Sequence, residues 1–378
     1  MRYRDKSGSA FFSELRHEVD RYFAVTANGN RFATPGLWCK AALLGMVVAG
    51  SYAALIAGPA DIFAAMFFYT VFAIGCLLLT LNLAHDAAHD ALTRHRRLNR
   101  AIHYAVFSTL GVDARLWQMR HVHSHHLYPN INGCDADIDH NPLIRLSPNH
   151  PWKRMFRFQH FYAPLVYLSV AFHSILIQDM VYIFKRRLAN LTDIRHGAGD
   201  YAMFALTKLA FFFAVIALPI ALAPLPWWQM LLAYLVSSMA MSILFVFALI
   251  GTHFSDSSIF PTVASDGTIA GSFVDNTFAT SLDWNPTSPW AIHLIGGLNA
   301  HIAHHLYPRV SHMHYRAISQ IVLRLTQKHG IAYHRTNLRG MIATHFRLLR
   351  KLGQDPEATR SGEFQLPAKP KSDTAIAL

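Results

Sequence analysis

Charged residues are scarce in this chain of 378 residues, at 15%, whereas apolar residues make up 52%. Soluble domains carry roughly 25% charged residues, so the composition excludes disorder and disfavours an ordinary soluble domain. Cysteine is also scarce: Cys39, Cys76 and Cys134 are odd in number and far apart, and they provide neither a disulfide framework nor a CxxC zinc site. We expect no cleavable signal peptide, because the first 36 residues are polar and mixed in charge.

Long apolar stretches are what the sequence has instead. Each is long enough to cross the roughly 30 Å of a bilayer's hydrocarbon core. The turn at residues 224–229 contains Trp227 and Trp228, as is typical of a membrane interface. The sequence therefore predicts an all-α integral membrane protein with four transmembrane helices in two hairpins. The four predicted spans are residues 41–57, 62–84, 202–223 and 230–251.

Lysine and arginine are absent from both hairpin turns, residues 58–61 and 224–229. Of the 34 basic residues, six lie in residues 1–37, fourteen in 85–201 and twelve after 252. Lys40 and Lys208 remain, at span ends where their side chains can snorkel to the interface. By the positive-inside rule both termini and the central loop are cytoplasmic. The net charge of +12 then reflects topology and anionic lipid, and we expect no nucleic-acid partner.

One further apolar segment, Phe161–Gln178, is ambiguous. It contains Pro164 and His173, and a single extra crossing would separate the histidine clusters described below. We therefore expect a helix that lies in the membrane interface. The predicted division of the chain is a cytoplasmic N-terminal segment, a membrane domain, and a C-terminal helix with a loose tail, at residues 1–37, 38–335 and 336–378.

Histidine is abundant, with 24 copies that gather in three clusters. Spacings of three and four residues place side chains on one face of a helix. The second and third clusters both continue as His-His-Leu-Tyr-Pro, and proline disfavours helix at the residue before it, so we predict that each ends a helix. The clusters are His85-Asp-Ala-Ala-His89, His121-Val-His123-Ser-His125-His126 and His301-Ile-Ala-His304-His305.

These clusters predict a metal site on the cytoplasmic side. A single histidine is more often a surface or core residue, but three helically spaced clusters on one membrane face are hard to explain in that way. Neutral imidazole suits Fe, Zn, Cu and Ni. So many ligands exceed one coordination shell, and the sequence therefore implies a histidine-rich site for two metals, carried by a cytoplasmic helical cap.

The boxes HxxxH, HxxxHH and HxxHH, in this order between apolar hairpins, resemble those of the membrane fatty-acid desaturase family over residues 38–335. The segments at 130–139 and 296–301 are similar to the branch of linoleoyl-type and front-end acyl desaturases. The resemblance implies that the boxes and His253, near the end of the fourth span, bind two iron ions, with His123 beside the ligands or spare. The implied ligands are His85, His89, His121, His125, His126, His253, His301, His304 and His305.

Polar residues beside the boxes are candidates to orient the ligands. Metal-bound imidazoles usually donate their other N–H group to a carboxylate or carbonyl. The Asp-x-Asp-x-Asp run could instead suggest calcium, but it lacks the glycine and distal glutamate of an EF-hand loop. The candidates are Asp86, Asp90, His123, Asp135, Asp137, Asp139 and Asn299.

The resemblance implies an oxidoreductase that converts CH2–CH2 of an acyl chain into CH=CH, using O2, two electrons and two protons and forming two waters. The acyl carrier stays open between CoA, a carrier protein and a membrane lipid. The His-Pro-Gly-Gly motif of a fused cytochrome b5 is absent from the sequence. We therefore expect a separate donor, ferredoxin or cytochrome b5 in type, and a bacterial inner membrane.

Three alternatives stay open at this point. A hydroxylase or ketolase of a hydrocarbon or carotenoid would share the metal site, because the reactions diverge only after the first hydrogen abstraction. A bis-histidine haem protein would pair ligands across spans, whereas these clusters lie at span ends. A metal transporter would need polar groups near the bilayer midplane, which the four spans largely lack.

Overall fold

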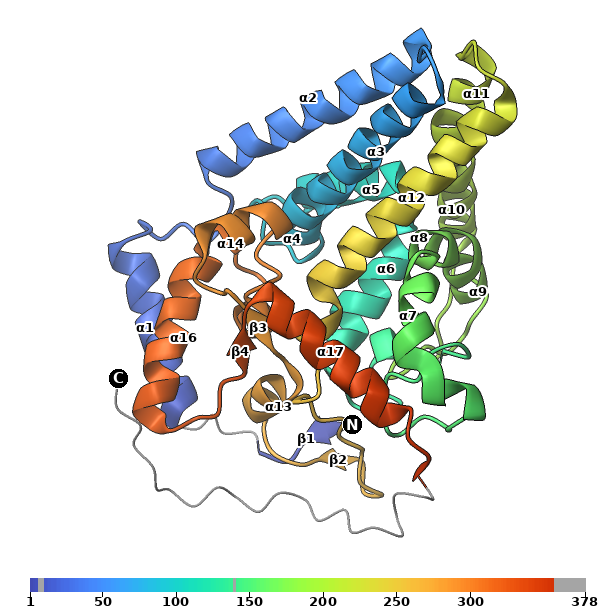
Figure 1. The fold of residues 1–378 in the computed structure, drawn as a ribbon. Helices are drawn as coiled ribbons and strands as arrows, with labels where there is room; N and C mark the ends of the chain where they lie inside the picture. Colours follow the sequence, from blue (N-terminus) through green and yellow to red (C-terminus); the bar gives the residue numbers. More distant parts are fainter. Residues whose placement is uncertain (6–9, 139–140, 357–378) are drawn as a thin grey trace.

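A computed structural model of the protein describes residues 1–5, 10–138 and 141–356, and these are mostly helical (Figure 1). The longer helices are α1 (Ala10–Val25), α2 (Pro35–Ala57), α3 (Ile62–Leu79), α5 (Arg96–Thr109), α10 (Ala198–Phe211), α12 (Trp227–Leu249), α16 (Tyr315–His329) and α17 (Leu338–Leu352). The shorter ones are α4 (His85–Ala88), α6 (Ala114–Arg120), α7 (Gln159–Tyr167), α8 (Val170–Phe172), α9 (Asp179–Tyr182), α11 (Leu218–Leu222), α13 (Phe273–Thr280), α14 (Pro289–Ile295) and α15 (His301–Leu306).

Among the described residues, four helical stretches are long and apolar enough to cross a membrane, as predicted, and a bent pair of helices described below would make a fifth if it were one span. The first of these helices begins at Pro35, before the predicted span 41–57, because proline is compatible with a first helical turn. Large apolar side chains such as Leu43, Phe63 and Phe67 point outward and are 58–77% exposed, so these helices need an apolar solvent. The stretches are Pro35–Ala57, Ile62–Ala88, Ala198–Leu222 and Trp227–Thr252.

The two turns that lack basic residues lie against each other. Gly58 has a φ of +98°, and a Cβ atom placed there would meet Pro224 Cδ at 2.8 Å. Asp61 begins α3 as its N-cap and accepts a hydrogen bond from Ala64 N at 2.8 Å. Both turns therefore sit at one end of the helix bundle, the end at the top of Figure 1.

The two lysines at span ends contact neighbouring helices. Lys40 Nζ lies 2.6 Å from Asn82 Oδ1 and 3.1 Å from a backbone carbonyl oxygen of α14. Lys208 Nζ donates to Asp179 Oδ2 at 2.6 Å, an ion pair that joins α10 to α9. Each lysine turns inward because a polar group of a neighbouring helix lies within its reach.

The ambiguous segment is a bent pair of helices rather than one straight rod. Residues 154–167 and 170–182 meet at 74°. Pro164 lies inside α7, and the break follows at residues 168–169. A bend of this size fits the predicted interfacial helix, whose position relative to a membrane stays a prediction.

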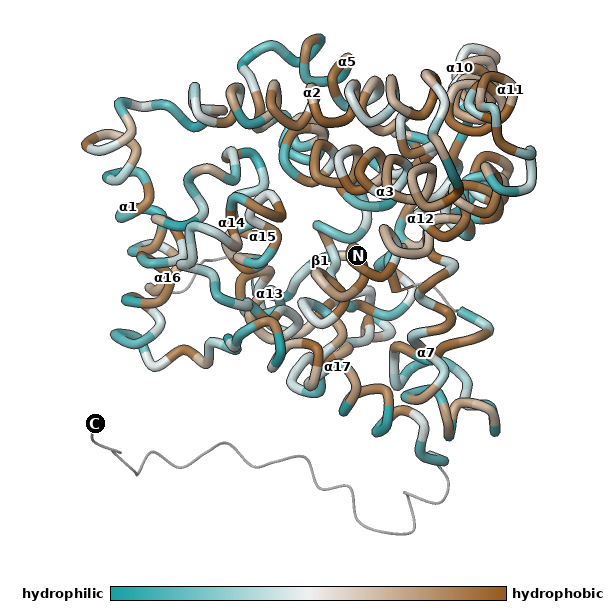
Figure 2. The backbone as a smooth tube through the Cα atoms, turned by 45° about the horizontal axis from the view of Figure 1, so that its top comes forward, coloured by the Kyte–Doolittle hydropathy of each residue, from teal (hydrophilic) through white to brown (hydrophobic). Residues whose placement is uncertain are grey.

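A less hydrophobic layer lies below the apolar helices, as the hydropathy colouring of Figure 2 shows. It contains α1 and α13 to α17, with two short parallel pairs of strands, β1 (Arg2–Tyr3) with β2 (Thr268–Ile269) and β3 (Asp283–Trp284) with β4 (Arg335–Thr336). The amphipathic start of the chain is α1, which packs against α16. The C-terminal helix is α17, and most of the predicted loose tail, residues 357–378, lies outside the described residues.

Candidate metal centre

The first histidine cluster continues the second apolar helix without a break. A π-helical segment, η1 (Thr80–Ala84), connects α3 to α4, so the helix widens just before the cluster. π-Helical turns are rare and occur frequently at functional sites. His85 and His89 are both 5% exposed, and their ring centroids lie 4.8 Å apart. The predicted i, i+4 pair therefore forms at the end of this helical stretch that is far from the turn at residues 58–61.

The second cluster lies in a π-helical turn, η2 (His121–His125), and not in the predicted α-helical turn. The backbone N–H of His126 bonds to the His121 carbonyl oxygen at 3.0 Å, a spacing of five residues. Their Nε2 atoms lie 3.1 Å apart. Because the wider turn brings residues five apart onto one face, it presents both rings together, while His123 is exposed.

The third cluster forms α15, which ends at Leu306, just before Tyr307, as predicted. Its N-terminus has no cap from its own N-cap residue, Ala300. Instead, Asp283 Oδ1 accepts a hydrogen bond from Ile302 N at 2.9 Å. Tyr333 donates its hydroxyl hydrogen to the same carboxylate at 2.6 Å, so α15 is held by a carboxylate from β3.

His253 follows the last turn of the fourth apolar stretch and joins the third cluster. It is 6% exposed, and its Nε2 atom lies 2.7 Å from that of His301 and 3.0 Å from that of His305. His253 therefore lies beside the box histidines, as the resemblance implied.

Together the clusters form groups whose candidate ligand atoms all lie within 4.8 Å of one another. The first group is His85, His89, His121 and His304, and the second group is His125, His253, His301 and His305. His126 lies between them, grouped with His304 and His305. Two groups of four fit the prediction of two metals better than one larger site does.

Two rings of the second group present unprotonated nitrogens to each other, an arrangement that would bind a cation. Nδ1 of His253 and Nδ1 of His301 each lie 3.1 Å from a backbone carbonyl oxygen, of Thr280 and Leu298 respectively. Because a carbonyl only accepts, both Nδ1 atoms carry hydrogen and both Nε2 atoms present lone pairs. Two lone pairs 2.7 Å apart repel each other, and a metal ion bound by both would remove that repulsion.

Burial keeps these rings in the neutral form that binds metals. Burial, with a smaller contribution from His125, lowers the pKa of His301 to about 3. Burial and the neighbouring histidines also lower the pKa of His126 and of His305 well below the usual value. Buried side-chain nitrogens without a hydrogen-bond partner in the described residues include Nε2 of His89 and of His304. These rings are thus held in the neutral form and partly lack hydrogen-bond partners, as a metal site requires.

Two of the predicted orienting carboxylates contact ligand candidates. Asp135 Oδ2 lies 2.9 Å from His125 Nδ1, and Asp137 Oδ2 lies 3.3 Å from His121 Nδ1. Burial lowers the pKa of His125, but the two carboxylates outweigh it and raise the pKa overall. An Asp137 carboxylate oxygen also lies 2.8 Å from Arg120 Nε. Burial raises the pKa of this carboxyl group, but Arg120 together with His121 and His125 outweighs burial and lowers the pKa overall.

Other candidates make different contacts. Asp86 accepts hydrogen bonds from Ser311 Oγ at 2.8 Å and from His312 Nδ1 at 2.9 Å, because the chain after α15 passes beside α4. Asp90 pairs with Arg96 at 3.5 Å. Asn299 donates to the carbonyl oxygens of residues 284 and 285, so it fixes the loop before α15. Asp139 lies outside the described residues.

The sequence did not predict three neighbours of the site. Asp283 caps α15, and His312 links Asp86 to Lys40, whose Nζ lies 3.3 Å from His312 Nε2. The Trp117 ring stacks on His121 with centroids 4.5 Å apart and planes 27° apart. Only Trp117 had a signal in the sequence, its i, i+4 spacing from His121.

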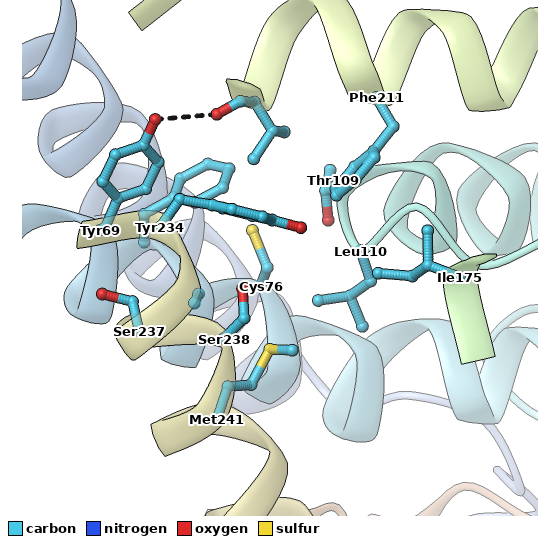
Figure 3. Close-up of a pocket in the computed structure, with 13 residues that line it drawn as sticks. Tyr69, Cys76, Thr109, Leu110, Ile175, Phe211, Tyr234, Ser237, Ser238 and Met241 are labelled. Carbon is cyan, nitrogen blue, oxygen red and sulfur yellow. Dashed lines mark hydrogen bonds between the residues drawn. The ribbon is translucent and has the colours of Figure 1, made fainter. Parts of the chain in front are cut away.

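A narrow, largely apolar pocket lies among the spans, and its lining residue on the second apolar helix nearest in sequence to His85 is Cys76. Figure 3 shows it between α3, α12 and α10, with the Tyr69 hydroxyl donating to the Val215 carbonyl at 3.0 Å. Its lining includes Phe72, Cys76, Leu110, Phe211 and Met241.

Comparison with known proteins identifies the family of this chain. The family model described as fatty acid desaturase matches residues 61–337, and the chain belongs to this family. An sn-1 linoleoyl-lipid 6-desaturase of Synechocystis sp. is 26% identical over 90% of this chain and 94% of its own length. One of the same description from Arthrospira platensis is 25% identical, over 92% and 94%. An acyl-lipid (8-3)-desaturase of Physcomitrium patens is 25% identical, over 93% and 74%.

Proposed function

We propose that the protein is an O2-dependent di-iron desaturase that introduces a C=C bond into a fatty acyl chain. The observation that carries this proposal is the pair of buried groups of four imidazoles. Family membership supports the same conclusion. The relatives named above are described as lipid desaturases, so we propose that the acyl chain is esterified to a membrane lipid.

The first and second groups would each hold one iron, with His126 between them. Iron supplies the oxidising power that an unactivated C–H bond requires and that no side chain provides. The chain's own residues bind the irons and hold their ligands in place. Asp135 and Asp137 accept hydrogen bonds from ligand Nδ1–H groups and so orient those rings.

The apolar pocket of Figure 3 has a cavity volume of about 20 Å³, room for little more than one water-sized group, and would have to widen to hold part of the acyl chain away from water. It lies in the membrane layer, and α3 runs from it toward His85. A chain seated there would pass its methylene groups by the histidines. Electrons would come from a separate ferredoxin or cytochrome b5-type donor.

We propose two transmembrane hairpins with the histidine-bearing layer and both termini in the cytoplasm of a bacterial inner membrane. The two turns without lysine or arginine meet at one end of the bundle, and the histidine groups lie toward the other. The positive-inside rule assigns the first end to the outside. Cysteine-accessibility labelling that placed residues 121–126 and 301–305 on opposite sides would contradict this topology.

The haem alternative loses support from the geometry. A haem iron takes four ligands from its porphyrin ring and at most two from protein. In each histidine group, the candidate ligand atoms of four imidazoles lie within 4.8 Å of one another, so there is no space for a porphyrin ring around the metal. Hydroxylation would use the same site, and product analysis separates it from desaturation.

The test is expression in a host that lacks the product and contains a suitable donor, followed by mass spectrometry of its lipids. We expect an acyl chain two mass units lighter, and about two irons in the purified chain. A chain sixteen units heavier would identify a hydroxylase. Stoichiometric zinc in protein made with ample iron would overturn the di-iron assignment.

A further inference from the structure

A second pocket lies on the same side of the apolar layer as the histidines but is lined differently. It opens between α5, α6, the residue after α9 and the start of α10. Its polar lining contains two arginines, Arg100 and Arg115, and its apolar lining includes Ile183 and Met203. None of its lining residues belongs to the metal centre or to the pocket of Figure 3.

The carboxylates of this pocket are already engaged. Asp113 Oδ1 accepts from Leu116 N at 2.8 Å, at the N-terminus of α6. Asp200 accepts from Gly197 N at 2.9 Å and pairs with Arg115 Nε at 3.3 Å. The two carboxylates therefore equal the two arginines in charge, but both are engaged in capping helices, and Arg115 is held by Asp200 and also contacts His196 Nδ1.

Arg100 differs from Arg115. Its guanidinium carbon lies 5.5 Å from the centre of the Tyr104 ring, and no carboxylate of the described residues lies within ion-pair distance of it. An exposed arginine beside an aromatic ring keeps its planar set of donors free for an anion. Phosphate suits that set, because a guanidinium can donate two parallel hydrogen bonds to it.

The surroundings of the pocket are those of a membrane interface. Phe184 is 74% exposed, Met203 44% and Tyr201 42%, and the rings of Phe184 and Tyr201 lie 6.2 Å apart. Exposed aromatic rings beside arginines mark the level of lipid head groups. α10 is also the cytoplasmic half of a proposed span. The anions at this depth are lipid phosphates.

We propose that this pocket binds the phosphate of a membrane phospholipid, with Arg100 as the main contact, Arg115 as the second, and Met203 and Tyr201 against the glycerol and first methylene groups. The proposal rests on the membrane placement above but not on the desaturation reaction. A binding measurement therefore tests it separately from activity.

The experiment measures lipid binding to the purified, detergent-solubilised chain by native mass spectrometry. The probes are dioleoyl phosphatidylethanolamine, a galactosyl diacylglycerol with the same acyl chains, and inorganic phosphate. We expect one tightly held phosphatidylethanolamine, weak galactolipid binding, and no displacement by millimolar phosphate. Arg100→Gln should weaken phospholipid binding about tenfold, or ~1.4 kcal/mol.

The matched control is Arg97→Gln, which removes the same charge one turn earlier on α5, where the side chain is exposed but does not line the pocket. A second variant, Gly199→Leu, fills the pocket from α10, where an added Cβ atom meets nothing within 4 Å. It should also reduce binding, without removing a charge. Equal loss in Arg97→Gln and Arg100→Gln, equal binding of the galactolipid, or displacement by phosphate alone would each overturn the assignment.

Discussion

Three of the four rings in the second histidine group have short contacts from Nδ1. His125 contacts Asp135 at 2.9 Å, and His253 and His301 contact backbone carbonyl oxygens at 3.1 Å. Such partners fix both the tautomer and the orientation of a ligand ring. The ligand rings of the second group are therefore preorganised for metal binding by contacts within the protein.

The first group is held more loosely. Within the described residues, the Nδ1 contacts of its rings are 3.3 Å from His121 to Asp137 and 3.4 Å from His304 to the Tyr315 hydroxyl oxygen. A π-helical segment, η1, leads into its ligands His85 and His89, whereas η2 carries one ligand candidate of each group, His121 and His125. The comparison suggests that the two metals have different affinities, with the tighter site in the second group.

The largest expected effect is that of removing His253. His253→Ala takes one ligand from the prepared group and leaves the Nε2 lone pairs of His301 and His305 without that neighbour. We expect desaturation to be abolished and iron to fall from about two per chain toward one, because a metal ion is held weakly once one of its few protein ligands is removed. Iron analysis and lipid profiling measure both.

The control for that variant is His293→Ala. His293 is exposed, and the contact that it makes to Lys40 uses its backbone carbonyl, which alanine keeps. It should retain iron and activity. Full iron in His253→Ala would show that this residue is not a ligand.

A smaller effect is expected from the partner of His125. Asp135→Asn keeps the shape of the side chain but removes the charge that faces Nδ1. Loss of such a partner typically weakens a metal site 10–100-fold, so we expect about that change for one of the two irons. Asp137→Asn should weaken binding less, because its contact to His121 is longer. A larger loss of iron binding in Asp137→Asn than in Asp135→Asn would mean that the first group holds its metal more tightly than the second.

Chelation sharpens the comparison without a mutation. If the first group holds its iron less firmly, a chelator should remove iron in two phases whose rates differ about tenfold. Tenfold is the lower end of the loss in metal affinity expected when one orienting hydrogen bond is missing. In His89→Ala the fast phase should be missing, and in His253→Ala the slow one. A single phase in the unaltered protein would mean that the groups bind equally.

The sequence brought the histidines of each box together correctly because helical spacing is local, and their role as ligands stays a prediction. His85 with His89, and His301 with His304 and His305, needed only the geometry of one helix. His253 needed the resemblance to a family in addition. The spacing failed in one respect, since the second cluster is a π-helical turn, and a one-residue insertion in helical hydrogen bonding has no signature in apolar periodicity.

The orienting residues were predicted less well because tertiary contacts decide them. Asp86 stands next to His85 in sequence, yet its carboxylate turns to Ser311 and His312. Asp283 lies 18 residues before His301 in the sequence. It belongs to β3, which pairs with β4, and from there its carboxylate reaches the backbone of α15. Nearness along the chain was therefore a poor guide to the carboxylates, although it was correct for Asp135.

The smallest expected effect is that of His123→Ala, which separates ligands from neighbours inside one cluster. His123 is exposed, whereas the π-helical turn directs His121, His125 and His126 inward. Its only contact in the described hydrogen bonds, from Asn190 Nδ2 at 3.0 Å, goes to its backbone carbonyl, which alanine keeps.

We therefore expect His123→Ala to retain both irons, to keep most activity, and to change the free energy of unfolding by less than about 0.5 kcal/mol, as is usual for surface positions. Iron content, lipid profile and thermal unfolding measured together test this. An iron-poor His123→Ala beside an iron-replete His253→Ala would mean that ligand and neighbour had been exchanged. The second group would then lack the ligand on which its contrast with the first group rests.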